Sequence, residues 1–79
     1  MMTAVESQVK DILLRMLDVD EDRIVPTALI REDLGATSID LLEFISTLEK
    51  EFDLNIDDED IPKLTSIQAT VDYLNSHKS

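Results

Sequence analysis

Apolar residues recur at helical spacing in three stretches of this chain, and no stretch shows the alternation that is typical of a strand. The first stretch predicts a helix from about Thr3 to Leu17. The second predicts a helix from Ser38 to about Phe52, and the third predicts one that follows a cap at Thr65 or Ser66 and ends at about Asn75. The pattern therefore indicates an all-α protein.

Two segments between these helices complete the predicted architecture. A long connection from Asp18 to Gly35 contains Pro26, and its apolar residues are expected to pack into the core. These residues are Ile24, Leu29, Ile30 and Leu34. Residues Asp57–Ile61 are suited to a short helix, which Pro62 stops or distorts. We therefore expect a small four-helix bundle with three main helices and a short third one.

The predicted helix that begins at Ser38 has an apolar face and a charged face. Its buried stripe is expected to contain Leu41, Ile45, Leu48 and Phe52, with Phe44 beside it. The outward positions are Asp40, Glu43, Thr47, Lys50 and Glu51. Ile39 and Leu42 flank the charged side, where they offer apolar contacts to a partner, although single apolar residues on a surface need no functional explanation.

The composition narrows the class of protein. A chain of 79 residues forms one small domain, which buries about 60% of its unfolded surface. Only 4% of the residues are aromatic, so the core must be mostly aliphatic. The absence of cysteine excludes disulfides, thiolate nucleophiles and zinc fingers. No apolar run reaches the ~20 residues of a membrane span and no signal peptide is visible, so we expect a cytoplasmic monomer that does not insert into membranes.

The charge is strongly negative and unevenly distributed. The formal net charge is −11, and the segment 32–60 holds eleven acidic residues and one basic residue, which gives −10 for that segment. Nucleic acids and anionic lipid surfaces are disfavoured as partners, because their phosphates would be repelled. A charge run of this kind is commonly a solvated face. It also favours electrostatic steering toward basic partner surfaces.

The start of the predicted helix at Ser38 is a place where an anion would be stabilised. Thr37 and Asp40 match a capping box, so Ser38 is expected at the first helical position. Its hydroxyl would then lie beside unpaired N–H groups at the positive end of the helix dipole. The spacing alone is equally compatible with an ordinary capped helix that happens to contain a serine.

Other chemistries fit the sequence poorly. Residues Asp18–Asp22 resemble the opening of a calcium loop, but Arg23 replaces the required glycine and Leu29 the required glutamate. We therefore expect no metal site. Hydrolysis at Ser38 lacks the nucleophile elbow motif, and the single histidine, His77, lies in a polar tail. Catalysis by paired carboxylates stays open, although so short a chain leaves little room for a substrate cleft. We expect a chain that is acted upon rather than an enzyme.

Residues Asp33–Glu43 resemble the phosphopantetheine attachment motif of acyl carrier proteins, with Ser38 at the position of the modified serine. The resemblance extends to Glu49–Phe52, to Ile56 with the acidic patch that follows it, and to Thr65–Leu74. It therefore covers essentially the whole chain.

The resemblance implies a function for particular residues. A phosphopantetheinyl transferase would attach 4'-phosphopantetheine to Ser38, with Asp33 and Thr37 close to the attachment site. The thiol of the arm would hold an acyl chain as a thioester for acyl-transferring, ligating and elongating enzymes that have basic docking surfaces. The residues implied to contact those enzymes are Ile39, Asp40, Leu42, Glu43 and Glu49. The residues implied to line the acyl pocket are Ile45, Leu48, Ile56 and Leu64.

Three departures from the family pattern leave the pathway open. Thr37 replaces an aspartate that commonly precedes the modified serine, and Ser46 stands where an apolar partner-facing residue is frequent. Pro62 lies where the third helix would otherwise continue. Fatty-acid, polyketide and related biosynthesis are all compatible with the sequence. An aminoacyl or D-alanyl carrier, and an acidic interaction module without a covalent arm, stay as alternatives.

Overall fold

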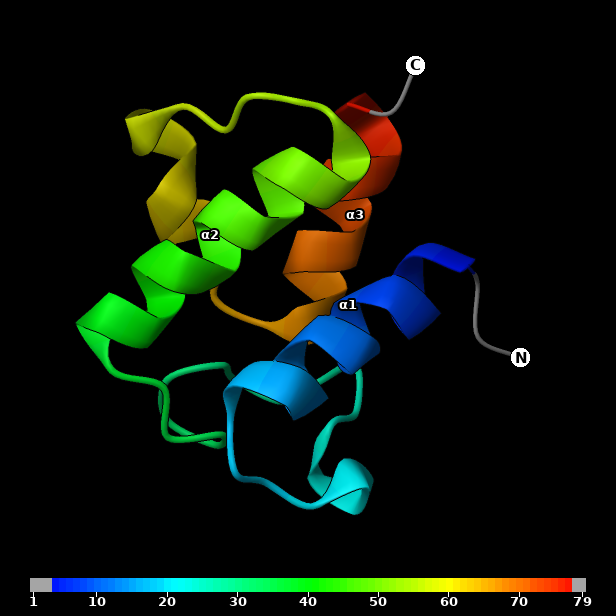
Figure 1. The fold of residues 1–79 in the computed structure, drawn as a ribbon, viewed down its shortest axis with the longest axis vertical. Coiled ribbons are helices and arrows are strands. Elements are labelled where there is room, and N and C mark those ends of the chain that lie inside the picture. The colour runs from blue at the N-terminus through cyan, green and yellow to red at the C-terminus, as the bar shows by residue number, and fades with distance from the viewer. Residues whose placement is uncertain (1–3, 78–79) are drawn as a thin grey trace.

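The computed structural model describes residues 4–77 as a bundle of helices joined by ordered connections. The elements are α1 (Ala4–Met16), the 3-10 helix η1 (Glu21–Arg23), α2 (Ser38–Phe52), the 3-10 helix η2 (Asp58–Lys63) and α3 (Ile67–His77). In Figure 1, α2 crosses in front of α3, while α1 and the long connection that follows it lie below. The predicted all-α fold with three main helices is confirmed. No helix within residues 4–77 is long and apolar enough to cross a membrane.

The core is aliphatic, as the composition predicts. Phe44 of α2 is 1% exposed and is its largest fully buried side chain. Helix α1 contributes Val5, Val9, Ile12 and Leu13, and α3 contributes Ile67, Val71 and Leu74. Thr70 is also buried, and its hydroxyl donates to the Ser66 carbonyl at 2.9 Å. The core therefore holds this polar group without leaving it unpaired.

Hydrogen bonds attach the long connection to the start of α3. The carbonyls of Pro26 and Ala28 accept from the backbone N–H groups of Gln68 and Ile67 at 2.9 and 3.1 Å. Ser66 Oγ accepts from the Ala69 N–H at 3.0 Å. Three of the N–H groups that a helix start leaves unpaired are thus satisfied. Of the two caps allowed by the sequence, the structure uses Ser66.

Leu29 is 37% exposed, so the prediction that it packs into the core is wrong. It forms an isolated antiparallel bridge with Ser66. Along an extended segment neighbouring side chains point to opposite sides, and here Ala28 and Ile30 are the buried pair. The other apolar residues expected to anchor the connection, Ile24, Ile30 and Leu34, are buried.

Helix boundaries differ from the prediction mainly at the short third helix. It runs through Pro62 to Lys63 as a 3-10 helix, so Pro62 does not stop it. The fixed φ of proline suits 3-10 geometry, which explains why the chain continues. Helix α1 ends one residue earlier than predicted and α3 two residues later, while the predicted start at Thr3 lies outside the described residues.

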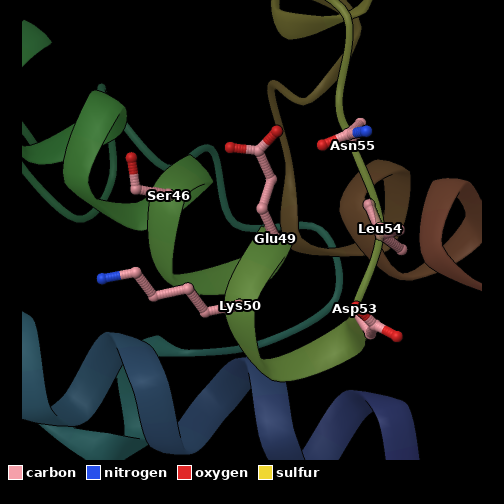
Figure 2. Close-up of a pocket in the computed structure, with 6 residues that line it drawn as sticks. All are labelled: Ser46, Glu49, Lys50, Asp53, Leu54 and Asn55. Carbon is pink, nitrogen blue, oxygen red and sulfur yellow. The ribbon is translucent and has the colours of Figure 1, made fainter.

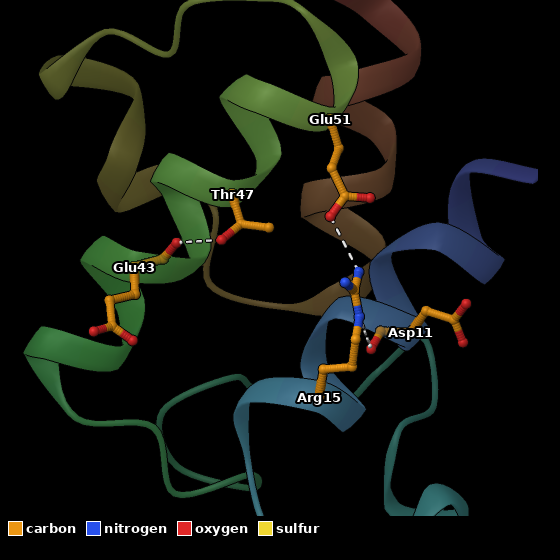
Figure 3. A network of polar contacts seen from close by, with 5 residues as sticks. All are labelled: Asp11, Arg15, Glu43, Thr47 and Glu51. Carbon is orange, nitrogen blue, oxygen red and sulfur yellow. Dashed lines mark hydrogen bonds and ion pairs between the residues drawn. The ribbon is translucent and has the colours of Figure 1, made fainter.

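The faces of α2 follow the predicted pattern with small shifts. Phe44, Ile45 and Leu48 are buried, whereas Leu41 and Phe52 at the edges of the stripe are half-buried. Two positions predicted to point outward, Asp40 and Thr47, are half-buried too. The Thr47 hydroxyl donates to the Glu43 carbonyl at 2.9 Å, and Arg15 of α1 contacts Glu51 of α2 at 3.1 Å (Figure 3).

Candidate functional site

The start of α2 is closed by the capping box that the sequence predicts. Thr37 Oγ1 accepts from the Asp40 N–H at 3.1 Å, and Asp40 Oδ2 accepts from the Thr37 N–H at 3.0 Å. The Thr37 backbone is extended, and its carbonyl accepts the first helical hydrogen bond from Leu41 at 2.9 Å. Threonine therefore performs the capping role in place of the more common aspartate.

Ser38 is the first residue of α2, and its side chain is exposed. Within residues 4–77 the Ser38 hydroxyl has no hydrogen-bond partner, and neither do the backbone N–H groups of Ser38 and Ile39. Two free donors therefore accompany the free hydroxyl in the first turn of a 15-residue helix. Such a helix end favours a negative group attached to that hydroxyl.

The turn before Ser38 is held by Asp33 and Gly35. Asp33 Oδ2 accepts from the Leu29 N–H at 2.8 Å, and the Asp33 N–H donates to the Leu29 carbonyl at 2.8 Å. Gly35 has a φ of +74°, a conformation that other residues adopt only with strain. Asp33, expected close to the attachment site, thus has its carboxylate engaged in closing the turn that leads to Ser38.

A partly apolar surface follows Ser38 on the outer side of α2. Ile39 is 70% exposed and Leu42 is 58% exposed, and Glu43 beside them is exposed as well. These residues line a hollow of about 400 Å³ together with Met16, Ser46, Thr47 and Lys50. The structure therefore brings together three of the five residues that the sequence assigned to partner binding.

Glu49, another of those five, belongs to a different hollow at the end of α2. Figure 2 shows the Glu49 and Lys50 side chains leaving α2 in different directions. Glu49 Oε2 accepts from the Ile56 N–H at 2.9 Å. This hollow has a volume of about 440 Å³, and its other lining residues are Ser46, Lys50, Asp53, Leu54 and Asn55, of which Ser46 and Lys50 also line the first hollow. Glu49 therefore helps to hold the chain after α2.

The residues expected to line an acyl pocket are all buried in the core: Ile45, Leu48, Ile56 and Leu64. Leu64 also borders a cleft, which has a volume of about 360 Å³. The cleft is lined by Arg31, Glu32, Leu41, Ile61, Pro62, Leu64 and Thr65. The sequence pattern did not assign Leu41 and Ile61 to a pocket. Two features of the sequence could have pointed to them: Leu41 lies at the edge of the apolar stripe of α2, and Ile61 directly precedes Pro62.

Two comparisons with known proteins assign the family. The family described as "Phosphopantetheine attachment site" matches residues 7–74. A solved acyl carrier protein from Enterococcus faecalis is 37% identical, covers 95% of this chain and 94% of its own, and has a TM-score of 0.80. This chain belongs to the acyl carrier protein family.

An acyl carrier protein is a non-catalytic carrier, and its cofactor is 4'-phosphopantetheine. It interacts with a phosphopantetheinyl transferase and with enzymes that handle acyl groups. The start of α2 fits the phosphate of this cofactor, because an exposed hydroxyl and two free N–H groups share one helical turn. Within residues 4–77 of this carrier protein no three His, Cys, Asp or Glu side chains are grouped to hold a metal ion.

The carrier protein also contains a polar cluster between η2 and α3. The Tyr73 hydroxyl donates to Asp60 Oδ2 at 2.9 Å, and Lys63 Nζ lies 3.0 Å from Asp60 Oδ1. The hydrogen bonds from Lys63 and Tyr73 hold the pKa of the Asp60 carboxyl below its ordinary value. Burial, followed by the hydrogen bond to Asp60, raises the pKa of the Tyr73 phenol to about 12. Nothing in the sequence pattern pointed to this pair.

Proposed function

We propose that this protein carries 4'-phosphopantetheine on Ser38 and holds acyl intermediates as thioesters for fatty-acid, polyketide or related biosynthetic enzymes. The observation that carries the proposal is the exposed, unpartnered Ser38 hydroxyl beside the free N–H groups of Ser38 and Ile39. When bound, the cofactor supplies a thiol, which this cysteine-free chain lacks. The role of the chain is then to orient the phosphate and present the arm to partner enzymes.

The cleft of about 360 Å³ supports an acyl cargo over an aminoacyl one. The apolar side chains of Leu41, Ile61, Pro62 and Leu64 line it. Burying the hydrocarbon part of a cargo against such walls is favourable, whereas an amino group there would lose its hydration. We propose that the acyl chain occupies this cleft, with Ile45, Leu48 and Ile56 forming the core around it.

We propose that partner enzymes dock on the outer side of α2, at Ile39, Leu42 and Glu43. The exposed apolar side chains would be buried in the contact, and Glu43 would face a basic group of the enzyme. A net charge of −11 would steer basic enzyme surfaces toward the protein.

Intact mass spectrometry tests the attachment site. The unmodified chain is incubated with coenzyme A and a promiscuous phosphopantetheinyl transferase, alongside Ser38→Ala and the control Ser76→Ala. Ser76 is an exposed serine on α3, so it controls for the loss of a surface hydroxyl. The wild type and Ser76→Ala are expected to gain one phosphopantetheine, and Ser38→Ala none. A gain that survives Ser38→Ala would overturn the assignment of Ser38.

The alternative of an acidic interaction module without a covalent arm is set aside, because the chain belongs to a family that carries phosphopantetheine. The mass of the chain isolated from its own cell identifies the cargo. An attached amino acid there, rather than a hydrocarbon chain, would contradict the acyl assignment.

A further inference from the structure

Helix η2 forms one wall of the cleft, through Ile61 and Pro62. None of its six residues is fully buried, and Ile61 is the apolar residue of η2 that packs, half-buried, against the core. Pro62 has no N–H to donate, and the Asp57 side chain makes no cap hydrogen bond at the start of η2. This wall of the cleft therefore depends on contacts with its neighbours.

One of those contacts joins η2 to α3. The Tyr73 hydroxyl of α3 donates to Asp60 Oδ2 at 2.9 Å, and Asp60 is the residue directly before Ile61. Lys63 Nζ lies 3.0 Å from the other Asp60 oxygen, so both oxygens are engaged. A hydrogen bond to a carboxylate is stronger than one between neutral groups.

The phenol itself is held on a rigid support. Helix α3 buries Ile67, Val71 and Leu74 in the core, and its first turn is bonded to the long connection. The His77 ring stacks on the Tyr73 ring with centroids 4.0 Å apart and planes at 19°. His77 Nδ1 also lies 2.9 Å from the Tyr73 carbonyl. Of the two elements joined by the phenol, α3 is therefore the fixed one.

We infer that Tyr73 is a positioning residue which, through Asp60, holds the η2 wall in place and so limits which acyl chains the cleft encloses. The first half of this inference concerns the chain alone. The second half rests on the proposed function, because it requires the acyl chain to occupy the cleft. Tyr73→Phe removes only the hydroxyl and keeps the ring that stacks on His77.

Amide hydrogen exchange of the unmodified chain tests the first half. In η2 the Asp60 N–H donates to Asp57 and the Leu64 N–H to Ile61. We expect these amides to exchange about tenfold faster in Tyr73→Phe, with amides in α1 unchanged. Thr47→Val, which removes a hydroxyl bonded within α2, is the control and is expected to leave η2 unchanged. Unchanged exchange in η2, or an equal rise throughout the chain, would overturn the inference.

Thioester cleavage tests the second half. The protein is loaded on its arm with acyl chains of increasing length, and cleavage by hydroxylamine is timed. In the wild type, cleavage is expected to slow as the acyl chain becomes long enough to enter the cleft. In Tyr73→Phe, the thioesters of these longer acyl chains are expected to be cleaved up to about ten times faster than in the wild type. Equal protection in both proteins would overturn the role in cargo selection. If the wild type gives no protection at any length while η2 exchange still responds, the proposed acyl cleft fails and the wall contact stands.

Discussion

Replacing Asp60 with asparagine is expected to lower the pKa of the Tyr73 phenol from about 12 toward its ordinary value of 10.0. Burial is the largest cause of the raised pKa and remains in the variant, so the new value is expected to lie between these limits. The hydrogen bond to Asp60 and the charge of Asp60 are the next causes, and both change when the carboxylate becomes an amide. Asp57 and Glu49 add smaller contributions that the substitution leaves in place.

Ultraviolet absorbance of the phenolate measures this pKa directly, since Tyr73 is the only tyrosine and there is no tryptophan. At pH 11, with a pKa of about 12 in the folded chain and 10.0 in the unfolded one, roughly one tenth of the folded phenols and nine tenths of the unfolded phenols are ionised. The ionised fraction of the phenol is measured at this pH without urea, where the chain is folded, and with urea, where it is unfolded. Circular dichroism verifies that the helices persist without urea. Asp58→Asn removes the same charge from an exposed position of η2 and serves as the control.

The raised pKa also fixes the direction of a stability change. The phenol is harder to ionise in the folded chain, so its contribution to stability is complete below pH 10 and is lost as the pH rises toward 12. Asp60→Asn should weaken this alkaline dependence, and Asp58→Asn should not. A wild-type phenol that ionises near pH 10 while folded, or an unchanged phenol in Asp60→Asn, would refute the reasoning.

Two further predictions concern α2. Asp53 ends the helix with a φ of 51°. In urea unfolding, the free energy of unfolding of Asp53→Gly is therefore expected to exceed that of Asp53→Ala by about 1 kcal/mol. Both variants remove the same charge, so equal stability of the two would argue against strain at this position. Glu43→Lys is expected to slow modification by a phosphopantetheinyl transferase up to about tenfold at low salt, and less at high salt. Glu59→Lys on η2 changes the net charge equally, and an equal slowing by both variants would show that Glu43 has no special place in docking.

The sequence by itself determined the features that depend on neighbours along the chain. The helical spacing of apolar residues located α2, and the pairing of Thr37 with Asp40 located its first residue, Ser38. A capping box closes within three residues, so its hydrogen bonds need no distant partner. The motif that points to the family lies in the same local segment, and the comparisons confirmed the family.

The tertiary structure decided every feature that joins distant segments. Leu29 points outward because its neighbours Ala28 and Ile30, which bond to Ile67 and Thr65, turn their side chains into the core. The Glu49 carboxylate is engaged by the Ile56 N–H. The cleft combines Leu41 of α2 with Ile61 of η2, and the hydrogen bond from Tyr73 to Asp60 spans thirteen positions. Such contacts depend on how the elements pack together, and a periodic pattern records only which face of each element is apolar. The start of α2 at Ser38 was therefore readable from local sequence, whereas the shape of the cleft and the hydrogen bond between Tyr73 and Asp60 were not.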